Sequence, residues 1–364
     1  TGQDDCALSV AYMSLDIPAT ALILKTELWM AAQSNYIASH REGGRFHNLN
    51  IIERLLPQGY VVVGRFQSRG KMEDGTVAPL AELCAQSDTD IAIIGDGGIG
   101  KTTFLQHLME AEFLAPDGSA RRYVRNRPVP FFIELNRCPD HIRDWYDSAL
   151  GKTNFITRYI SQIWENHASL DSVSPQTLDA VEKELQRVPD NGKAQYLLLL
   201  DGFNEVRAGG SVRADLSNEI TVLHTYPNVR IITTSRETQA AYYASAFQNI
   251  RLVGLEEGEI LTHLEKCGVP QPVIGNVRAC DSLMRCLRIP LYLCMFSVEQ
   301  ERDRFLPETA GEILYCFFHK DSAFYNARAR MSEARSSSLT EQQIAVVLDF
   351  IIPYIGWSFE NSDV

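Results

Sequence analysis

The sequence lacks several features that would each indicate a particular class of protein. Its eight cysteines include no Cys-x-x-Cys pair and no spacing typical of zinc ligands, so a small fold held by zinc or disulfides is not indicated. The most apolar C-terminal stretch, "IAVVLDFIIPYIGW", is interrupted by Asp349 and Pro353 and is too short to span a bilayer. Internal repeats and low-complexity blocks are also missing, so nothing indicates a repeat architecture.

Positive charge is scarce as well. The formal net charge is −12 and the isoelectric point is near 5.2, which argues against a surface that coats nucleic acid or anionic membrane. The one concentrated basic stretch, "ARRYVRNR" at residues 120–127, precedes an apolar run and is interpreted as a solvated loop. We therefore expect no direct binding of nucleic acid and no membrane span.

The scattered cysteines indicate a cellular location, and the first residue indicates whether the chain is part of a longer protein. Cysteines placed singly in a chain of this size are typical of reduced core residues, and they favour a cytoplasmic location. No signal peptide is visible and the sequence opens with Thr1, so we expect a piece of a longer protein. With 45% hydrophobic and 22% charged residues, the 364 residues are enough for two or three compact units.

The sequence pattern changes three times along the chain. Residues 1–80 carry no recognisable chemistry, and the turn-rich segment Arg69–Thr76 marks their expected end. Over residues 81–255, short apolar runs alternate with helix-length segments, which predicts an α/β class fold with a doubly wound parallel sheet. Residues 256–335 have helical patterns, and residues 336–364 begin a further unit after a capping-box signal. The runs expected as strands are "IAIIG", "VPFFIEL", "QYLLLLD", "VRIITTSR" and "IRLVGL".

The stretch "GDGGIGKTT" satisfies the phosphate-loop pattern G-x-x-x-x-G-K-[ST]. It follows a buried strand and opens a helix, so its backbone N–H groups and the helix N-terminus can surround phosphate oxygens. Lys101 is expected to reach the β- and γ-phosphates, and Thr102 to offer its hydroxyl to Mg²⁺. The plain alternative is a glycine-rich turn between strand and helix. The residues expected to contact the nucleotide are Gly95, Asp96, Gly97, Gly98, Ile99, Gly100, Lys101, Thr102 and Thr103.

Three further residues are expected to act on the bound nucleotide. Asp201 ends the run "LLLLD", where the carboxyl end of a strand opens onto the ligand crevice, and it would hold Mg²⁺ opposite Thr102. Glu205 could orient or deprotonate an attacking water. Arg236 follows "IITTS" at the same edge and could contact a γ-phosphate. The alternatives are a turn residue for Asp201, a solvated loop carboxylate for Glu205, and an ordinary surface arginine.

Four segments, "IAIIGDGGIGKTT", "VPFFIELNRC", "YLLLLDGFNEV" and "NVRIITTSR", resemble the NACHT family of STAND signal-transduction ATPases in their order and spacing. The resemblance covers about residues 58–355. It implies a nucleotide-binding α/β domain, a helical domain and then a winged-helix domain, of which residues 336–364 would be the start. Pro290 in "RIPLYL" matches the family proline that touches adenine, the plain alternative being a proline that opens a core helix.

One departure from the family pattern concerns hydrolysis. The family usually has two acidic residues at the end of the "DGFNE" motif, and the first of these positions is Asn204 here. An amide cannot act as a base, so hydrolysis is expected to be slow, through Glu205, or nearly absent.

The leading hypothesis is an ATP/ADP switch. Nucleotide exchange and slow hydrolysis would control opening and self-association of the chain, together with an unidentified activating ligand and effector. The resemblance implies a role in animal innate immunity or cell-death signalling, or in bacterial antiviral defence. Two alternatives stay open: a working ATPase that remodels nucleic acid or protein, and a scaffold that holds nucleotide without turnover.

Overall fold

The computed structural model describes residues 67–87, 89–113, 128–165, 169–190, 192–206, 210–236, 247–298 and 306–318. The basic stretch at residues 120–127 and the expected further unit at residues 336–364 lie outside the described residues, as does most of the segment 1–80. Among the described helices, none has the length and apolar character needed to cross a membrane.

A seven-stranded sheet in the order β2-β1-β7-β3-β6-β5-β4 forms the centre of the fold. Five of its strands are parallel, and in four of them the apolar side chains are buried on both faces because helices cover the sheet on both sides. In the fifth, β7, Ile250 and Leu252 are buried and Arg251 between them is exposed. The predicted α/β class with a mostly parallel sheet is therefore confirmed. The parallel strands are β3 (Ile91–Ile94), β4 (Val129–Glu134), β5 (Tyr196–Asp201), β6 (Val229–Ser235) and β7 (Gln248–Val253).

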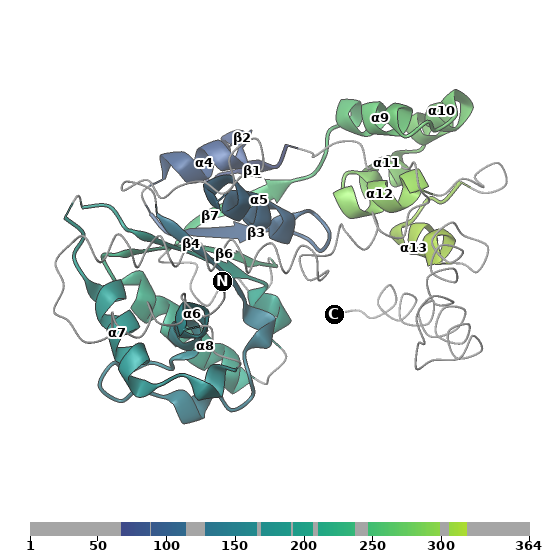
Figure 1. Ribbon diagram of the computed structural model, residues 1–364. Helices are drawn as coiled ribbons and strands as arrows, with labels where there is room; N and C mark the ends of the chain where they lie inside the picture. The colour runs from purple at the N-terminus through teal and green to yellow at the C-terminus, as the bar shows by residue number, and fades with distance from the viewer. Residues whose placement is uncertain are drawn as a thin grey trace, which may run out of the picture.

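Helices cover the two faces of this sheet unequally (Figure 1). Helices α4 (Leu80–Gln86) and α5 (Lys101–Phe113) lie on one face. Helices α6 (Phe155–Glu165), α7 (Pro175–Gln186) and α8 (Gly210–His224) lie on the other. Short 3₁₀ segments are interspersed between these elements: η2 (Leu135–Arg137), η3 (Ile142–Trp145), η4 (Leu170–Ser172) and η5 (Phe203–Glu205).

The start of α7 follows the sequence signal. Ser174 is the N-cap, its side chain accepts a hydrogen bond from the backbone N–H of Thr177 at 3.1 Å, and Pro175 is the first helical residue.

The turn-rich segment expected as a boundary belongs to the sheet instead. β1 (Arg69–Lys71) and β2 (Val77–Pro79) form an antiparallel hairpin, and β1 pairs with β7. The expected turn is present, with Gly75 in the left-handed region at φ 88°. Strands of three residues are too short to show an alternating pattern, which is why the sequence indicated only the turn between them.

The chain beyond the sheet is helical in its described part (Figure 1), and its buried residues form an apolar core of their own. The helices are α9 (Glu257–Lys266), α10 (Gln271–Ala279), α11 (Asp281–Leu287), α12 (Pro290–Val298) and α13 (Ala310–Phe318). The sheet and these helices meet at Arg69, whose guanidinium contacts the carboxylates of Glu256 and Glu259. Those two glutamates also form the capping box of α9, so this contact joins β1 to the first helix of the helical part.

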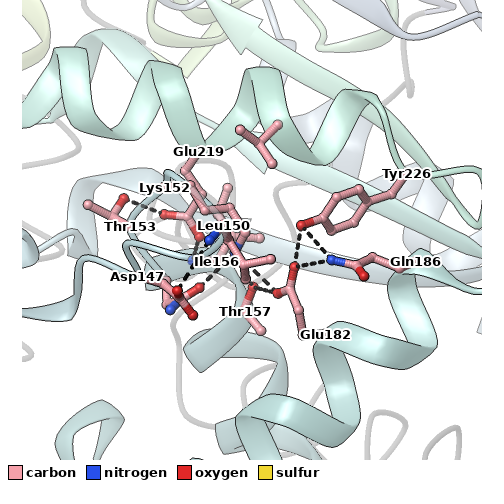
Figure 2. A network of polar contacts seen from close by, with 12 residues as sticks. Asp147, Leu150, Lys152, Thr153, Ile156, Thr157, Glu182, Gln186, Glu219 and Tyr226 are labelled. Carbon is pink, nitrogen blue, oxygen red and sulfur yellow. Dashed lines mark hydrogen bonds and ion pairs between the residues drawn. The ribbon is translucent and has the colours of Figure 1, made fainter.

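A buried polar network joins the helices on one face of the sheet (Figure 2). Lys152 is fully buried, and its ammonium lies 3.2 Å from the carboxylate of Glu182 on α7. The same ammonium donates to Asn154 at 2.7 Å, and Glu182 accepts further hydrogen bonds from Thr157 and Tyr226. A buried ion pair is tolerated only when its remaining donors and acceptors are satisfied, and here the neighbouring side chains satisfy them.

Glu219 on α8 provides the second half of this network (Figure 2). Its carboxylate accepts hydrogen bonds from the backbone N–H groups of Phe155 and Ile156, at 3.0 and 2.7 Å, and from the hydroxyl of Thr153 at 2.8 Å. One side chain of α8 therefore caps the N-terminus of α6 by accepting hydrogen bonds from its first backbone N–H groups.

Candidate functional site

The glycine-rich loop connects β3 to α5 at the carboxyl ends of the parallel strands. Gly98 and Gly100 have φ angles of 76° and 104°, in the left-handed region that favours glycine. The helix begins at Lys101, directly after the loop, and Phe104 donates to the carbonyl of Gly100 at 2.9 Å. The strand, loop and helix therefore follow one another as the phosphate-loop pattern predicts.

Lys101 lies inside the curve of this loop. Its ammonium donates to the carbonyl oxygens of Gly95 and Asp96, at 2.6 and 2.8 Å. Burial lowers the pKa of Lys101, and the nearby guanidinium of Arg236 lowers it further. Both hydrogen bonds go to neutral carbonyl oxygens, and an anionic phosphate oxygen would be a stronger acceptor for the same ammonium.

Thr102 and Asp201 meet across the edge of the sheet. The hydroxyl of Thr102 donates to Asp201 Oδ2 at 2.8 Å, although the two residues are 99 positions apart in the sequence. The other oxygen, Oδ1, accepts from Thr234 at 2.7 Å. Burial raises the pKa of Asp201, while these two hydrogen bonds lower it. The two oxygen-bearing residues expected at the metal are therefore neighbours.

The turn after β5 positions Glu205. Gly202 adopts a left-handed conformation at φ 75°, and its carbonyl accepts from the backbone N–H of Glu205 at 2.8 Å. The Glu205 side chain is exposed and folds back over Gly202, where a β-carbon would lie 3.1 Å from its Oε2 atom. Arg213 on α8 holds the turn by donating to the carbonyls of Asn204 and Val206, at 3.3 and 3.0 Å.

Arg236 reaches the phosphate loop from the end of β6. Because β6 lies between β3 and β5 in the sheet, its carboxyl end lies between the loop and Asp201. The Arg236 guanidinium is exposed, and its Nη2 atom lies 3.5 Å from the place where a β-carbon on Gly97 would be. Two cationic side chains, Lys101 and Arg236, are therefore brought to one loop.

The helical part touches this loop directly. Leu291 donates its backbone N–H to the carbonyl of Gly98 at 3.3 Å. A β-carbon on Gly98 would lie 2.7 Å from Leu291 Cβ and 3.4 Å from Ile289 Cγ2, so the two segments are in van der Waals contact. Pro290 is the first residue of α12, and lies between these two contacts. Its expected contact with a base stays a prediction.

Three residues of this region escaped the sequence analysis. Thr234 and Leu291 are two of them, and the third is Glu134, the last residue of β4, which pairs with Asp201 in the register of the sheet. The charge of Glu134 contributes to the raised pKa of Asp201. A glutamate closing the run "VPFFIE" was the available signal, since the carboxyl ends of parallel strands share one edge.

The donors present fit a magnesium–nucleotide complex. Within the described ranges, no group of three or more histidine, cysteine or acidic side chains could hold a metal alone. Mg²⁺ commonly takes one or two carboxylates together with substrate phosphates and water, and Thr102 and Asp201 offer a hydroxyl and a carboxylate oxygen. A metal here would therefore depend on phosphate oxygens for its remaining ligands.

Comparison with known proteins agrees with this geometry. A profile of the NACHT domain matches residues 89–266, which span the sheet from β3 onward and reach α9. No curated protein gives a significant match to the chain. Residues 89–266 are therefore a NACHT domain, which is a domain of the STAND family of phosphate-loop NTPases.

Proposed function

We propose that this protein is an ATP/ADP switch in which the nucleotide on the phosphate loop controls whether the helical part stays packed against that loop. The observation that carries the proposal is the contact of Leu291 with Gly98, because it joins the loop to α12 through a hydrogen bond and close packing. A ligand shifts a conformational equilibrium only through contacts that differ between the two states. A change of loop shape on nucleotide exchange is such a difference.

The chain's own side chains discriminate between the two nucleotides. Lys101 exchanges its carbonyl partners for phosphate oxygens, while Thr102 and Asp201 hold Mg²⁺. The bound Mg²⁺ neutralises part of the phosphate charge. Arg236 then faces the γ-phosphate from the neighbouring strand, so a triphosphate gains a cationic contact that a diphosphate lacks.

Hydrolysis in this scheme is slow and resets the switch. Glu205 is the carboxylate available to orient water, and its charge is close enough to Asp201 to raise the pKa of that residue. Asn204 stands where the family usually has an acid, and its amide cannot take a proton.

The proposed output is self-association in the cytoplasm, in immune or antiviral defence signalling. The ATP state opens the helical part and exposes a surface for other copies of the chain, under control of an activating ligand and with an effector downstream. A scaffold that holds nucleotide permanently would instead co-purify with nucleotide that resists exchange. A working ATPase would show turnover on the order of 10 per second.

The test is the molecular mass of the purified protein, measured by light scattering with MgADP and with MgATP. We expect a larger assembly with MgATP, and we expect Lys101→Ala to abolish it because nucleotide binding weakens by about 100-fold or more. The matched control is Lys183→Ala, which removes an exposed lysine from α7. An assembly that ignores both ATP and the loss of Lys101 would contradict the switch.

A further inference from the structure

Thr234 lies at the centre of the candidate site, although its sequence position indicated no functional role. It is fully buried, in the penultimate position of β6, between the strands that carry the phosphate loop and Asp201. Its hydroxyl lies 2.9 Å from the backbone N–H of Gly202 and 2.7 Å from Asp201 Oδ1. The N–H can only donate, so the hydroxyl accepts there and its own hydrogen goes to the carboxylate.

The hydrogen bond from the Thr234 hydroxyl to Asp201 Oδ1 fixes the orientation of the Asp201 carboxylate. The rotation of an aspartate about its last torsion is broad, so packing alone holds it poorly. Here each oxygen has its own hydroxyl donor: Thr234 holds Oδ1, and Thr102 on α5 holds Oδ2. One carboxylate oxygen therefore faces the phosphate loop and the other faces β6. Without the Thr234 hydroxyl, Oδ1 would lose this hydrogen-bond donor, and the carboxylate would be free to turn.

The hydrogen bond from the Gly202 N–H to the Thr234 hydroxyl holds the turn that follows β5. The left-handed conformation of Gly202 directs its N–H toward β6, where Thr234 accepts it. That turn leads into η5, which carries Glu205. The strand of Thr234 ends one residue before Arg236, whose guanidinium approaches the phosphate loop. One buried hydroxyl therefore connects the strand of Arg236 to the carboxylate and to the turn of Glu205.

We propose that Thr234 is a positioning residue, which aims the Asp201 carboxylate at the magnesium ion of a bound nucleotide. This inference rests on the proposed function, because it assumes that Asp201 acts on magnesium. It predicts that loss of the hydroxyl weakens binding of the metal complex far more than binding of the nucleotide alone. A merely structural role would weaken both to the same extent.

The experiment measures ATP affinity calorimetrically, once with excess Mg²⁺ and once with EDTA. Thr234→Val keeps the size of the side chain and removes the hydroxyl. We expect the affinity with Mg²⁺ to fall by about tenfold or more, and the affinity in EDTA to change by less than about threefold. Thr234→Ser keeps the hydroxyl and should restore the wild-type ratio of the two affinities. If the valine variant does not fold, Thr234→Ala removes the same hydroxyl without adding bulk.

The matched control is Thr233→Val, an equally buried threonine that points to the other face of the same strand. It should keep the wild-type ratio of the two affinities. Equal loss of affinity with and without Mg²⁺ in Thr234→Val, or no loss in either, would overturn the positioning role of Thr234. Either result would leave the proposed function standing. A wild-type protein whose ATP binding ignores Mg²⁺ would overturn the magnesium site of the proposed function, and this inference with it.

Discussion

The buried carboxylate of Glu219 makes the stability of this domain depend on pH. The side chain is fully buried, and burial raises its pKa from the ordinary glutamate value of 4.5 to about 7. The charge of Lys152 and the donors from Thr153, Phe155 and Ile156 lower the pKa, but only in part. We predict that the free energy of unfolding falls as the pH rises from about 4.5 to about 7.

The sign follows from which state holds the proton. Between these two pH values the folded chain keeps the proton of Glu219, whereas the unfolded chain has lost it. The folded state therefore binds more protons, and raising the pH favours unfolding until Glu219 ionises in the fold near pH 7. One pKa unit corresponds to about 1.4 kcal/mol, so the full difference is on the order of 3 kcal/mol.

The assay is urea denaturation of the wild type and of Glu219→Gln across this pH range. The variant cannot ionise at this position, so the stability of the wild type relative to the variant should fall by about 3 kcal/mol between the two ends of the range. Other groups with raised pKa values, such as Asp90 and Asp201, are present in both proteins and cancel in the comparison. Glu265→Gln, at an exposed position of α9, controls for the loss of one negative charge.

Two parallel stability curves for the wild type and Glu219→Gln would refute the reasoning. They would mean that Glu219 ionises at the same pH in the folded and unfolded chains, so that its three donors and Lys152 fully offset its burial.

The remaining predictions concern the contacts between the sheet and the helical part. Gly98→Ala should allow assembly without ATP, because the added β-carbon meets Leu291 and displaces the helical part, in addition to the strain of a positive φ, which is about 1–2 kcal/mol. Gly75→Ala carries comparable backbone strain with open space around it and should keep assembly dependent on ATP, whereas assembly that stays ATP-dependent in Gly98→Ala would contradict the role of the Leu291 contact. Arg69→Met should lower the free energy of unfolding by about 1 kcal/mol, measured by denaturation, since its contact with Glu259 is partly exposed. An unchanged unfolding midpoint would show that this contact adds nothing.

The features that were predictable from the sequence are those that follow from local pattern and from the geometry of parallel sheets. Short apolar runs indicated four of the five parallel strands, because a strand buried on both faces needs no polar alternation. The fifth strand, β7, was indicated by the run "IRLVGL", which contains the exposed Arg251. The approach of Asp201 to Thr102 was expected because the carboxyl ends of parallel strands share one edge. The NACHT resemblance followed from the same motifs and agrees with the match over residues 89–266.

The features that escaped prediction depend on contacts between distant segments. "TT" in β6 gave no sign of which threonine faces Asp201, since only the register of the sheet decides that. Charged residues in a sequence are normally solvated, so the buried pair of Lys152 and Glu182 could not be distinguished from surface charges. The contact of Leu291 with the phosphate loop needs the whole helical part to fold back onto the sheet.

The hairpin of β1 and β2 determines where this domain can be cut. A fragment that began at residue 81, where the helix-length pattern starts, would remove the strand that pairs with the outer side of β7. The backbone N–H and C=O groups on that side would then be open to another chain, and exposed edges of this kind promote aggregation. A recombinant fragment of the NACHT domain should therefore start before Arg69, so that β7 keeps its partner and the protein stays dispersed.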